Sequence, residues 1–401
     1  MTLILAGLFV LLPLLIWLRI DYTLGRKEHL KTIPKKSFSM MKTGEIDLLI
    51  NGKDFYDQFY QDVSNSTSSI HILFYIIRDD AISHELFLLL ERKAKEGIEV
   101  RLMVDFIGAS KMKKKSIQML RDAGVQFAYS HKPRFPFIFY TLQARNHRKI
   151  TVIDGKIGYL GGFNIGEEYL GNDAKMGFWR DYHLKISGQG VKDLQSQFFL
   201  DWEKASKEKV EKKPLYFPLL EEGSIPMNFL SSYGRDLEEH FIEFIQKANR
   251  ELFICTPYFI PGKPLQKELI KAAQRGVKIK IMVPSRKDHP FVTEAAFPYY
   301  GPLLAAGCEI YRFYYGFYHV KTIIVDDQLC DIGTANFDKR SLFLNDEINC
   351  LIYSKSFISA VKQTVLDDMK DSEQLTMEFY ENRPISQRAK EKFATAISHF
   401  L

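Results

Sequence analysis

The same arrangement of histidine, lysine and aspartate occurs twice in the sequence. Residues 147–154 read HRKITVID and residues 319–326 read HVKTIIVD, so the three residue types recur at identical offsets, 172 residues apart. Two accidental copies of this pattern would be expected in about 0.1% of chains of this composition. The repeat therefore indicates a chemical site rather than two unrelated structural histidines.

The repeat continues beyond the eight residues, into GGFN (161–164) in the first copy and GTAN (333–336) in the second. The repeated functional positions are His147, Lys149, Asp154 and Asn164 in the first copy and His319, Lys321, Asp326 and Asn336 in the second. Residues i and i+2 of an extended strand share a face, so the histidine and lysine of each copy should point together.

Two histidines and two lysines that converge in one cleft would suit a phosphate group. The lysines and the asparagine amides would bind the oxygens on which charge builds during phosphoryl transfer. One histidine could attack phosphorus while the other protonates the leaving alkoxide. The sequence has no carboxylate cluster of the metal-binding kind and no close Cys/His cluster, so we expect neither a metal nor a cofactor.

The elements that position these residues are themselves repeated. Apolar runs, amphipathic helices that end at a glycine, and β-branched strands match pairwise between residues 68–77 and 249–260, 85–105 and 267–284, and 120–130 and 303–313. Strands that alternate with helices predict βαβ units and a mostly parallel sheet. The fold class expected is therefore α/β, built from two similar halves.

A charged, then proline-bearing stretch separates the two copies and reads as a linker. We expect a first half at residues 45–205, a linker at 206–222 and a second half at 223–401. Residues 383–401 have apolar positions at helical spacing and should form a terminal helix that packs on the body or lies on a membrane surface.

The first twenty residues form the most apolar segment of the chain. No charge occurs from Thr2 to Leu18, a length just sufficient for a bilayer core of about 30 Å. Basic residues follow this segment and predict a cytoplasmic main domain with the N-terminus outside. We expect a single-pass transmembrane anchor at residues 1–20 and a juxtamembrane linker at 21–44. A cleaved signal peptide and a buried soluble helix are the alternatives.

The composition is that of an ordinary globular protein, with 46% apolar and 26% charged residues among 401. The net charge of +6 favours an anionic partner. Charge alone does not distinguish nucleic acid from acidic lipid.

The paired HxKxxxxD motifs resemble those of the phospholipase D superfamily, and the resemblance covers residues from about 45 to 401. It implies that each half is an α/β sandwich, that the halves are related by pseudo-symmetry, and that they share one active site. It also implies a covalent phosphohistidine on His147, with His319 as general acid and then general base. The motif aspartates, Asp154 and Asp326, would mainly support the site structurally.

The same resemblance implies an acidic residue some way past each histidine. Asp181 in FWRDYH and Glu347 in NDE occupy such positions. A carboxylate behind an imidazole fixes its tautomer and stabilises the imidazolium. We therefore expect Asp181 to pair with His319 and Glu347 with His147; the alternative is that each is a surface carboxylate or a helix cap.

Aromatic residues mixed with Arg and Lys precede each motif, at 131–146 and 311–318. Such segments suit the lipid headgroup zone, or form a lid on the protein's own surface. These segments, together with the apolar N-terminus, make the chain similar to bacterial cardiolipin synthases of the phospholipase D type, as do the sequences FWRDYHLKI and DKRSLFLNDEIN. The common form of that family has two N-terminal membrane segments, whereas one is visible here.

This resemblance implies transfer of a phosphatidyl group between two phosphatidylglycerol molecules in the cell membrane, giving cardiolipin and glycerol without a nucleotide. The alternatives are a hydrolytic phospholipase D, a membrane-bound phosphodiesterase or nuclease, and a non-catalytic lipid-binding scaffold. We expect no nucleic-acid partner, and the oligomeric state stays open.

Overall fold

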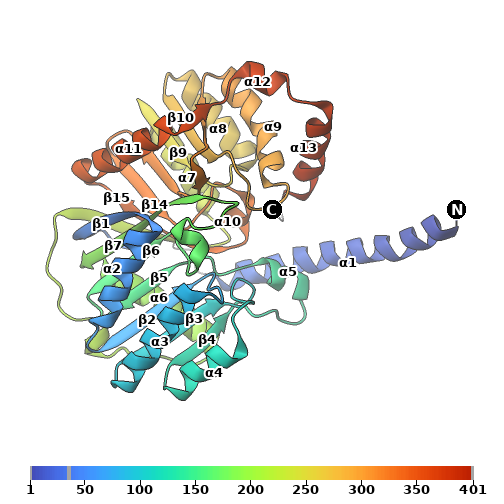
Figure 1. Ribbon diagram of the computed structural model, residues 1–401. Coiled ribbons are helices and arrows are strands. Elements are labelled where there is room, and N and C mark those ends of the chain that lie inside the picture. The colour runs from blue at the N-terminus through green and yellow to red at the C-terminus, as the bar shows by residue number, and fades with distance from the viewer. Residues whose placement is uncertain (1, 34–37, 399–401) are drawn as a thin grey trace.

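The structure is a computed structural model that describes residues 2–33 and 38–398, with side chains described from residue 12 onward. Two consecutive halves have similar orders of elements, except that the second has a strand at 316–318 where the first has a helix at 138–143, and an added helix at 339–343 (Figure 1). The first half consists of β1 (Lys42–Asn51), α2 (Gly52–Ser64), β2 (Ser69–Phe74), α3 (Ala81–Lys95), β3 (Glu99–Asp105), α4 (Lys114–Asp122), β4 (Gln126–Ser130), α5 (Ile138–Gln143), β5 (Ile150–Ile153), β6 (Ile157–Gly161), β7 (Phe178–Gly188) and α6 (Val191–Ser206).

The second half repeats this plan and adds short elements at its end. It consists of β8 (Ile225–Tyr233), α7 (Leu237–Lys247), β9 (Glu251–Cys255), α8 (Gly262–Gln274), β10 (Lys278–Pro284), α9 (Val292–Ala305), β11 (Glu309–Phe313), β12 (Gly316–Tyr318), β13 (Thr322–Val325), β14 (Leu329–Gly333), α10 (Lys339–Phe343), β15 (Asp346–Ile352), α11 (Lys355–Lys370), β16 (Ser372–Gln374), α12 (Met377–Glu381) and α13 (Ile385–Ile397).

The strands of both halves form one continuous sheet. Its order from one edge is β4-β3-β2-β5-β6-β7-β1, followed by β8-β15-β14-β13-β9-β10-β11 and the short β16. The second series is the first in reverse, so β1 and β8 meet antiparallel at the junction. This arrangement is the pseudo-symmetry expected of a duplicated chain.

The prediction of a mostly parallel sheet is wrong. Parallel pairing holds for β2, β3 and β4 and for β9, β10 and β11, where helices connect the strands. The pairs β5–β6 and β13–β14 are antiparallel, because only three residues connect each pair and a parallel connection needs a dozen or more. The strands after the motifs therefore turn back instead of crossing over.

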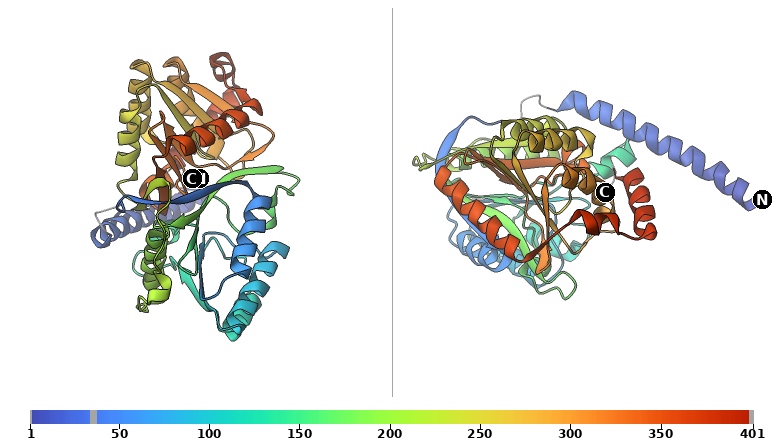
Figure 2. Two further views of the ribbon diagram at one scale, coloured as in Figure 1. Left: turned by 90° about the vertical axis from the view of Figure 1, so that its left-hand side faces the viewer. Right: turned by 90° about the horizontal axis from the view of Figure 1, so that it is seen from above.

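Helices cover both faces of the sheet, as Figure 2 shows for the first half between α6 and the pair α2 and α3. Alternating residues of β2 enter different cores: Ile70 and Ile72 pack with α2 and α3, and Leu73 packs in the core that contains α6. That second core also contains Val361 of α11 and runs through both halves without a break. The halves are therefore joined by a shared core, which fixes the strand ends that carry the motifs.

The N-terminal helix α1 (Thr2–Thr32) extends away from the body at its N-terminal end (Figure 1). Its C-terminal half is docked: the Asp21 carboxylate accepts a hydrogen bond from the backbone N–H of Tyr140 at 2.8 Å. A Cβ on Gly25 would lie 2.6 Å from that of Tyr140. The His29 ring contacts the carbonyl of Tyr233 at 3.0 Å. Residues 21–32 of the expected juxtamembrane segment are thus part of a docked helix.

No helix in the described part of the chain has the length and apolar character needed to cross a bilayer. The predicted anchor at residues 1–20 is therefore not confirmed. Met1 lies outside the described residues, as do the side chains of residues 2–11.

At the C-terminal end, α13 packs against α9, with Ala394 in the core of the second half, while residues 399–401 lie outside the described residues.

Candidate active site

At the start of each motif, the backbone forms a hydrogen bond to a strand of the other half. His147 and Lys149 immediately precede β5, and His319 and Lys321 immediately precede β13. The backbone N–H of His147 donates to the carbonyl of Asp346 in β15 at 2.9 Å, and that of His319 donates to the carbonyl of Arg180 in β7 at 2.7 Å. The segment before His319, β12, also pairs in parallel with β7. Each histidine is therefore fastened to a strand of the opposite half.

Those same strands carry the two carboxylates. His147 Nδ1 lies 2.9 Å from Glu347 Oε2, and His319 Nδ1 lies 2.5 Å from Asp181 Oδ2. All four side chains are buried. Because a carboxylate only accepts hydrogen bonds, each contact assigns the imidazole proton to Nδ1 and leaves Nε2 as the reactive nitrogen. The structure thus brings each carboxylate to the histidine of the other half.

Hydroxyl groups hold the Glu347 carboxylate in place. Thr334 donates to Oε2 at 2.6 Å and Ser341 donates to Oε1 at 2.8 Å. Ser341 is itself fixed because Asp338 caps the start of α10 through the Ser341 N–H. The sequence analysis missed these two hydroxyls as site residues, although both lie in the segments GTAN and DKRS that it singled out.

The carboxylate of Asp181 is accommodated differently. Gly162 occupies the position in the first copy that Thr334 occupies in the second. A Cβ at Gly162 would lie 2.0 Å from Asp181 Oδ1, so only glycine leaves room for this carboxylate. Oδ1 instead accepts the backbone N–H of Tyr182 at 2.8 Å. The two halves therefore support equivalent carboxylates by different means.

The two motif lysines are buried ammonium groups. Lys149 Nζ donates to the carbonyl of His147 at 2.7 Å, and across residues 12–33 and 38–398 no carboxylate lies within ion-pair distance of it. Burial lowers its pKa to about 7, with Glu347 opposing and Lys321 reinforcing the shift. A buried cation without a carboxylate partner is costly unless an anion occupies the site. Lys149 therefore marks a position for an anionic group.

Lys321 lies beside the second dyad. Its Nζ is 2.7 Å from His319 Nδ1 and 3.6 Å from Asp181 Oδ2. Two donors cannot bond to each other, so the carboxylate is the favourable partner of the ammonium group. Burial lowers the pKa of Lys321 to about 8, against the effect of Asp181.

The histidines are neutral in the resting site. Burial lowers the pKa of His147 although Glu347 opposes the shift, and burial together with Lys321 lowers that of His319 to about 4. Burial favours the protonated carboxylates, but the lysines and the hydrogen bonds from the imidazoles lower the pKa values of both Asp181 and Glu347. The resting site therefore combines neutral imidazoles with ionised carboxylates.

The charges of one motif act on the other. Lys321 contributes to lowering the pKa values of His147 and Lys149, and Asp181 contributes to raising that of Lys149. The two motifs therefore form one electrostatic unit.

The motif aspartates lie at the far ends of β5 and β13. Asp154 accepts the backbone N–H groups of residues 67–69, and Asp326 accepts those of residues 249–251, at 2.7–3.0 Å. Both have left-handed backbones, with φ of 55° and 50°. In the described part of the chain neither contacts an imidazole. They fasten the beginnings of β2 and β9 to the motif strands.

The two asparagines have different environments. The amide of Asn164 is engaged, with Oδ1 accepting the N–H of Ile76 at 3.0 Å and Nδ2 donating to Tyr169 at 3.2 Å. Asn336 Oδ1 is buried with no hydrogen-bond partner among the described residues. An amide oxygen accepts hydrogen bonds and cannot donate to a phosphate oxygen, so this free acceptor does not by itself provide the expected phosphate contact.

Aromatic rings wall the two imidazoles, and the sequence analysis missed them. The Tyr75 ring centroid lies 4.9 Å from that of His147, and the Trp179 and Tyr258 centroids lie 5.1 and 6.4 Å from that of His319.

Within the described residues, no group of three or more His, Cys, Asp and Glu side chains is arranged to hold a metal ion.

A duplicated α/β fold whose halves each bring one HxK pair to a shared site, each histidine backed by a carboxylate from the opposite half, defines a phospholipase D-like protein. The family described as "Cardiolipin synthase, PLD-like domain" matches residues 42–198 and 241–369, which together are most of the chain. The chain belongs to this family.

Curated relatives agree with this assignment. The chain is 47% identical over 382 residues to the minor cardiolipin synthase ClsB of Bacillus subtilis, covering 95% of each chain. It is 39% identical over 361 residues to the cardiolipin synthase of Oceanobacillus iheyensis, covering 89% of this chain and 75% of that relative. These relatives confirm the family expected from the sequence and the predicted class of enzyme, a phosphatidyltransferase.

A solved structure shares the fold. The phosphatidylserine synthase of Haemophilus influenzae superposes with a TM-score of 0.71 at 16% identity, covering 94% of this chain and all of that one. At this identity the likeness concerns the fold alone.

Proposed function

We propose that this protein is a cardiolipin synthase that transfers a phosphatidyl group from one phosphatidylglycerol to another through a phosphohistidine on His147. The observation that carries the proposal is the pair of crossed dyads, His147–Glu347 and His319–Asp181, beside the buried ammonium of Lys149. Nucleophile and acid must act on opposite sides of one phosphorus atom, and each half supplies one of them.

In the first step, His147 Nε2 attacks phosphorus and the bond from phosphorus to the headgroup glycerol breaks. His319 takes up a proton at Nε2 from water when the anionic phosphodiester binds and raises its pKa. It gives this proton to the departing alkoxide, and Asp181 stabilises the imidazolium until that transfer. Glycerol leaves, and the phosphatidyl group remains on His147. Lys149 and Lys321 balance the charge on the non-bridging oxygens.

In the second step, the glycerol hydroxyl of another phosphatidylglycerol attacks the phosphohistidine. His319 Nε2 takes the proton of that hydroxyl, the bond from phosphorus to nitrogen breaks, and cardiolipin forms. One phosphodiester replaces another, so the exchange needs no nucleotide. Water must be kept from the intermediate, and the walls formed by Tyr75 and Trp179 suit that requirement.

We also propose that the protein works at the cell membrane, with residues 1–20 as a single-pass anchor and the two halves on the cytoplasmic side. The exposed apolar side chains of α1 support this location, among them Leu12, Leu15 and Trp17. The basic residues Arg19, Arg26 and Lys27 follow them, as expected next to anionic lipid headgroups.

Product analysis tests the proposed function. Purified full-length protein in vesicles that contain glycerol-labelled phosphatidylglycerol should release glycerol and form cardiolipin in equal amounts. Phosphatidic acid as the lipid product would instead establish hydrolysis, and cleavage of single-stranded DNA without lipid turnover would establish a nuclease. The variants His147→Ala and His319→Ala serve as controls and should form little or no cardiolipin.

A further inference from the structure

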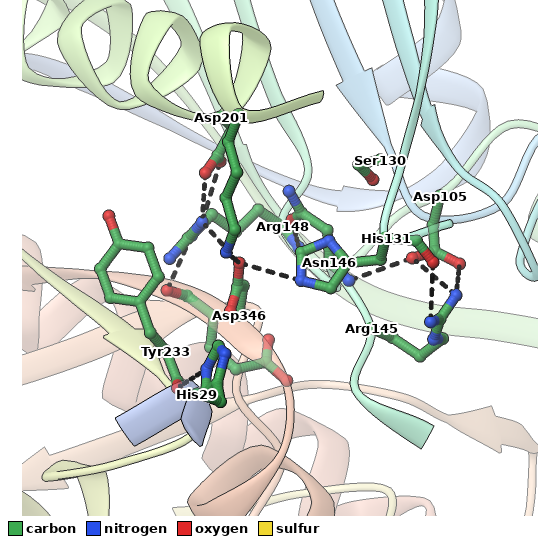
Figure 3. Close-up of polar contacts among 12 residues, drawn as sticks. His29, Asp105, Ser130, His131, Arg145, Asn146, Arg148, Asp201, Tyr233 and Asp346 are labelled. Carbon is green, nitrogen blue, oxygen red and sulfur yellow. Dashed lines mark hydrogen bonds and ion pairs between the residues drawn. The ribbon is translucent and has the colours of Figure 1, made fainter. Parts of the chain in front are cut away.

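A second polar cavity lies outside the two-histidine site, where α1, α5 and α6 meet. Its volume is about 80 Å³. The residues that line it and carry the argument are His29, His131, Lys132, Arg134, Thr141 and Lys204. Figure 3 shows the polar contacts around it. The proposed reaction assigns no role to these residues.

The carboxylates of the cavity are already matched by cations. The Asp346 carboxylate lies 3.2 Å from His131 Nε2 and 3.5 Å from Lys204 Nζ. Arg148 binds Asp201 at 2.7 Å and lies 3.6 Å from Asp346 (Figure 3). Arg148 and Lys204 thus offset the charges of Asp201, which lines the cavity, and of Asp346, which pairs with two lining residues.

The mouth of the cavity has surplus positive charge. Lys132 and Arg134 are exposed, and in the part of the chain that the structure describes no carboxylate lies within ion-pair distance of either. Arg134, followed by burial and Lys204, lowers the pKa of Lys207. Such repulsion between cations means that the local potential is positive and that an anion would relieve it.

The surroundings of the mouth suit a lipid. Phe135 follows Arg134 directly and is 86% exposed, and the Tyr140 ring lines the cavity. The helix α1, with exposed Leu24 and Ile20, is docked beside the cavity through Asp21. Apolar side chains next to unneutralised cations match the boundary between acyl chains and anionic headgroups.

We propose that this cavity binds the phosphate headgroup of an anionic phospholipid, as a site separate from the one that contains His147 and His319. Lys132 and Arg134 would bind the phosphate oxygens, and Phe135 and α1 would contact the acyl chains. The inference goes beyond the proposed function and needs no phosphatidyl transfer. Asp346, which pairs with the lining residues His131 and Lys204, directly precedes Glu347 on β15, so the strand that carries the dyad of His147 also contacts the cavity's side chains.

Protection of a single introduced cysteine tests the proposal without turnover. The four native cysteines are buried, and Ala205 lines the cavity, so Ala205→Cys provides a selective target for maleimide. Dihexanoyl phosphatidylglycerol, below its micelle-forming concentration, should slow this labelling at least about tenfold in full-length protein. Adding Lys132→Gln and Arg134→Gln should remove the protection, whereas Lys114→Gln and Lys115→Gln, a matched exposed pair on α4, should leave it intact.

The outcomes separate the sources of the phosphate. Equal protection by inorganic phosphate would contradict a lipid site, and equal protection by dihexanoyl phosphatidylcholine would contradict selection of an anionic headgroup. Failure of phosphatidylglycerol to protect would overturn the proposal even if cardiolipin forms. Calorimetry on His147→Ala, which retains Ala205, gives a second measurement: the Lys132/Arg134 variant should bind dihexanoyl phosphatidylglycerol at least about tenfold more weakly than the Lys114/Lys115 variant.

Discussion

The buried carboxylates set the chemistry of the two histidines. Each carboxylate fixes the Nδ1 proton of the imidazole that the opposite half supplies, so Nε2 is free to attack phosphorus or to exchange a proton. Burial keeps both rings neutral at rest. The proposed transfer requires a neutral nucleophile, His147, and an acid, His319, that becomes charged only when substrate is bound.

Neutral replacements of the carboxylates should therefore reduce catalysis more than folding. We expect Glu347→Gln and Asp181→Asn to lower kcat about 10²–10⁴-fold, because an amide can present its N–H₂ group to Nδ1 and select the wrong tautomer. Quenched-flow measurement of phosphatidylglycerol turnover checks this. The control Glu373→Gln alters an exposed carboxylate on β16 and should turn over normally; equal rates in all three variants would contradict the dyad account.

The pKa values of the buried bases predict a bell-shaped dependence of kcat/KM on pH. On the acid side, activity rises as His147 loses its proton, at a pH below the ordinary histidine pKa of about 6.5. On the alkaline side, activity falls as His319 loses the proton that it must donate, from a pKa of about 4 in the free enzyme. It falls more steeply as Lys149 and then Lys321 lose their protons, from pKa values of about 7 and about 8. Initial rates from pH 5 to 10 with short-chain phosphatidylglycerol measure this profile.

The fall of activity on the alkaline side should occur at a higher pH in the profile of kcat than in the profile of kcat/KM. A bound phosphodiester is an anion and stabilises the ammonium form of both lysines. A flat kcat/KM from pH 7 to 9.5 would contradict the assignment of these lysines as the phosphate-binding cations.

At the scale of the elements, the motif aspartates connect strands. Asp326 ends β13 and accepts three backbone N–H groups where β9 begins. Asp154 does the same between β5 and β2. The last residue of the HxKxxxxD motif therefore holds the strand that follows the histidine and lysine in register with the centre of its half.

We expect Asp326→Asn to lower the free energy of unfolding by about 1–3 kcal/mol, because charge-assisted hydrogen bonds to backbone are lost. Asparagine tolerates the left-handed backbone at this position, so strain does not confuse the result. The neighbouring Asp327 is exposed, and Asp327→Asn should change stability by less than about 0.5 kcal/mol. Urea unfolding measures both; equal midpoints, or a changed pH profile for Asp326→Asn, would assign Asp326 a different role.

The order and spacing of residues predicted the repeat of the HxK motif and of the elements around it. The expectation of both dyads came instead from the resemblance to the phospholipase D superfamily. Thr334 and Ser341 were not predicted as site residues. A hydroxyl that supports the site can lie at any number of residues from the histidine along the chain, so spacing does not reveal it. The antiparallel pairs β5–β6 and β13–β14 were missed because motif strands and helix-linked strands have the same β-branched composition. Short connections, not composition, decide their direction.

For the whole molecule, the position of α1 would determine how the two halves face the membrane in the proposed function. Asp21, Gly25 and His29 fasten its C-terminal half to the body, while the described residues further toward the N-terminus expose apolar side chains. Figure 2 shows this part as an arm outside the body. In the proposed membrane role, a docked arm would give the two-histidine site and the proposed lipid cavity one fixed orientation to the lipid surface.

Removing apolar character from this arm should weaken membrane binding without altering the folded body. We expect Leu12→Glu/Leu15→Glu to reduce co-sedimentation with phosphatidylglycerol vesicles at least about tenfold, because two exposed leucines are lost and negative charge is added. Leu88→Glu/Leu200→Glu changes charge equally at side chains of the same exposure, 60% and 57% against 59% and 59%. Equal co-sedimentation of the two variants would contradict the membrane role of α1.

The central claim is that the imidazoles of the two halves act in sequence on one phosphorus atom, His147 first. The most direct measurement is acid-free rapid quenching with labelled phosphatidylglycerol, followed by mass spectrometry of the labelled peptide in His319→Ala and His147→Ala. The account predicts a phosphatidyl adduct on His147 that accumulates in His319→Ala and is absent from His147→Ala. An adduct on His319, or turnover that continues in His147→Ala, would contradict it.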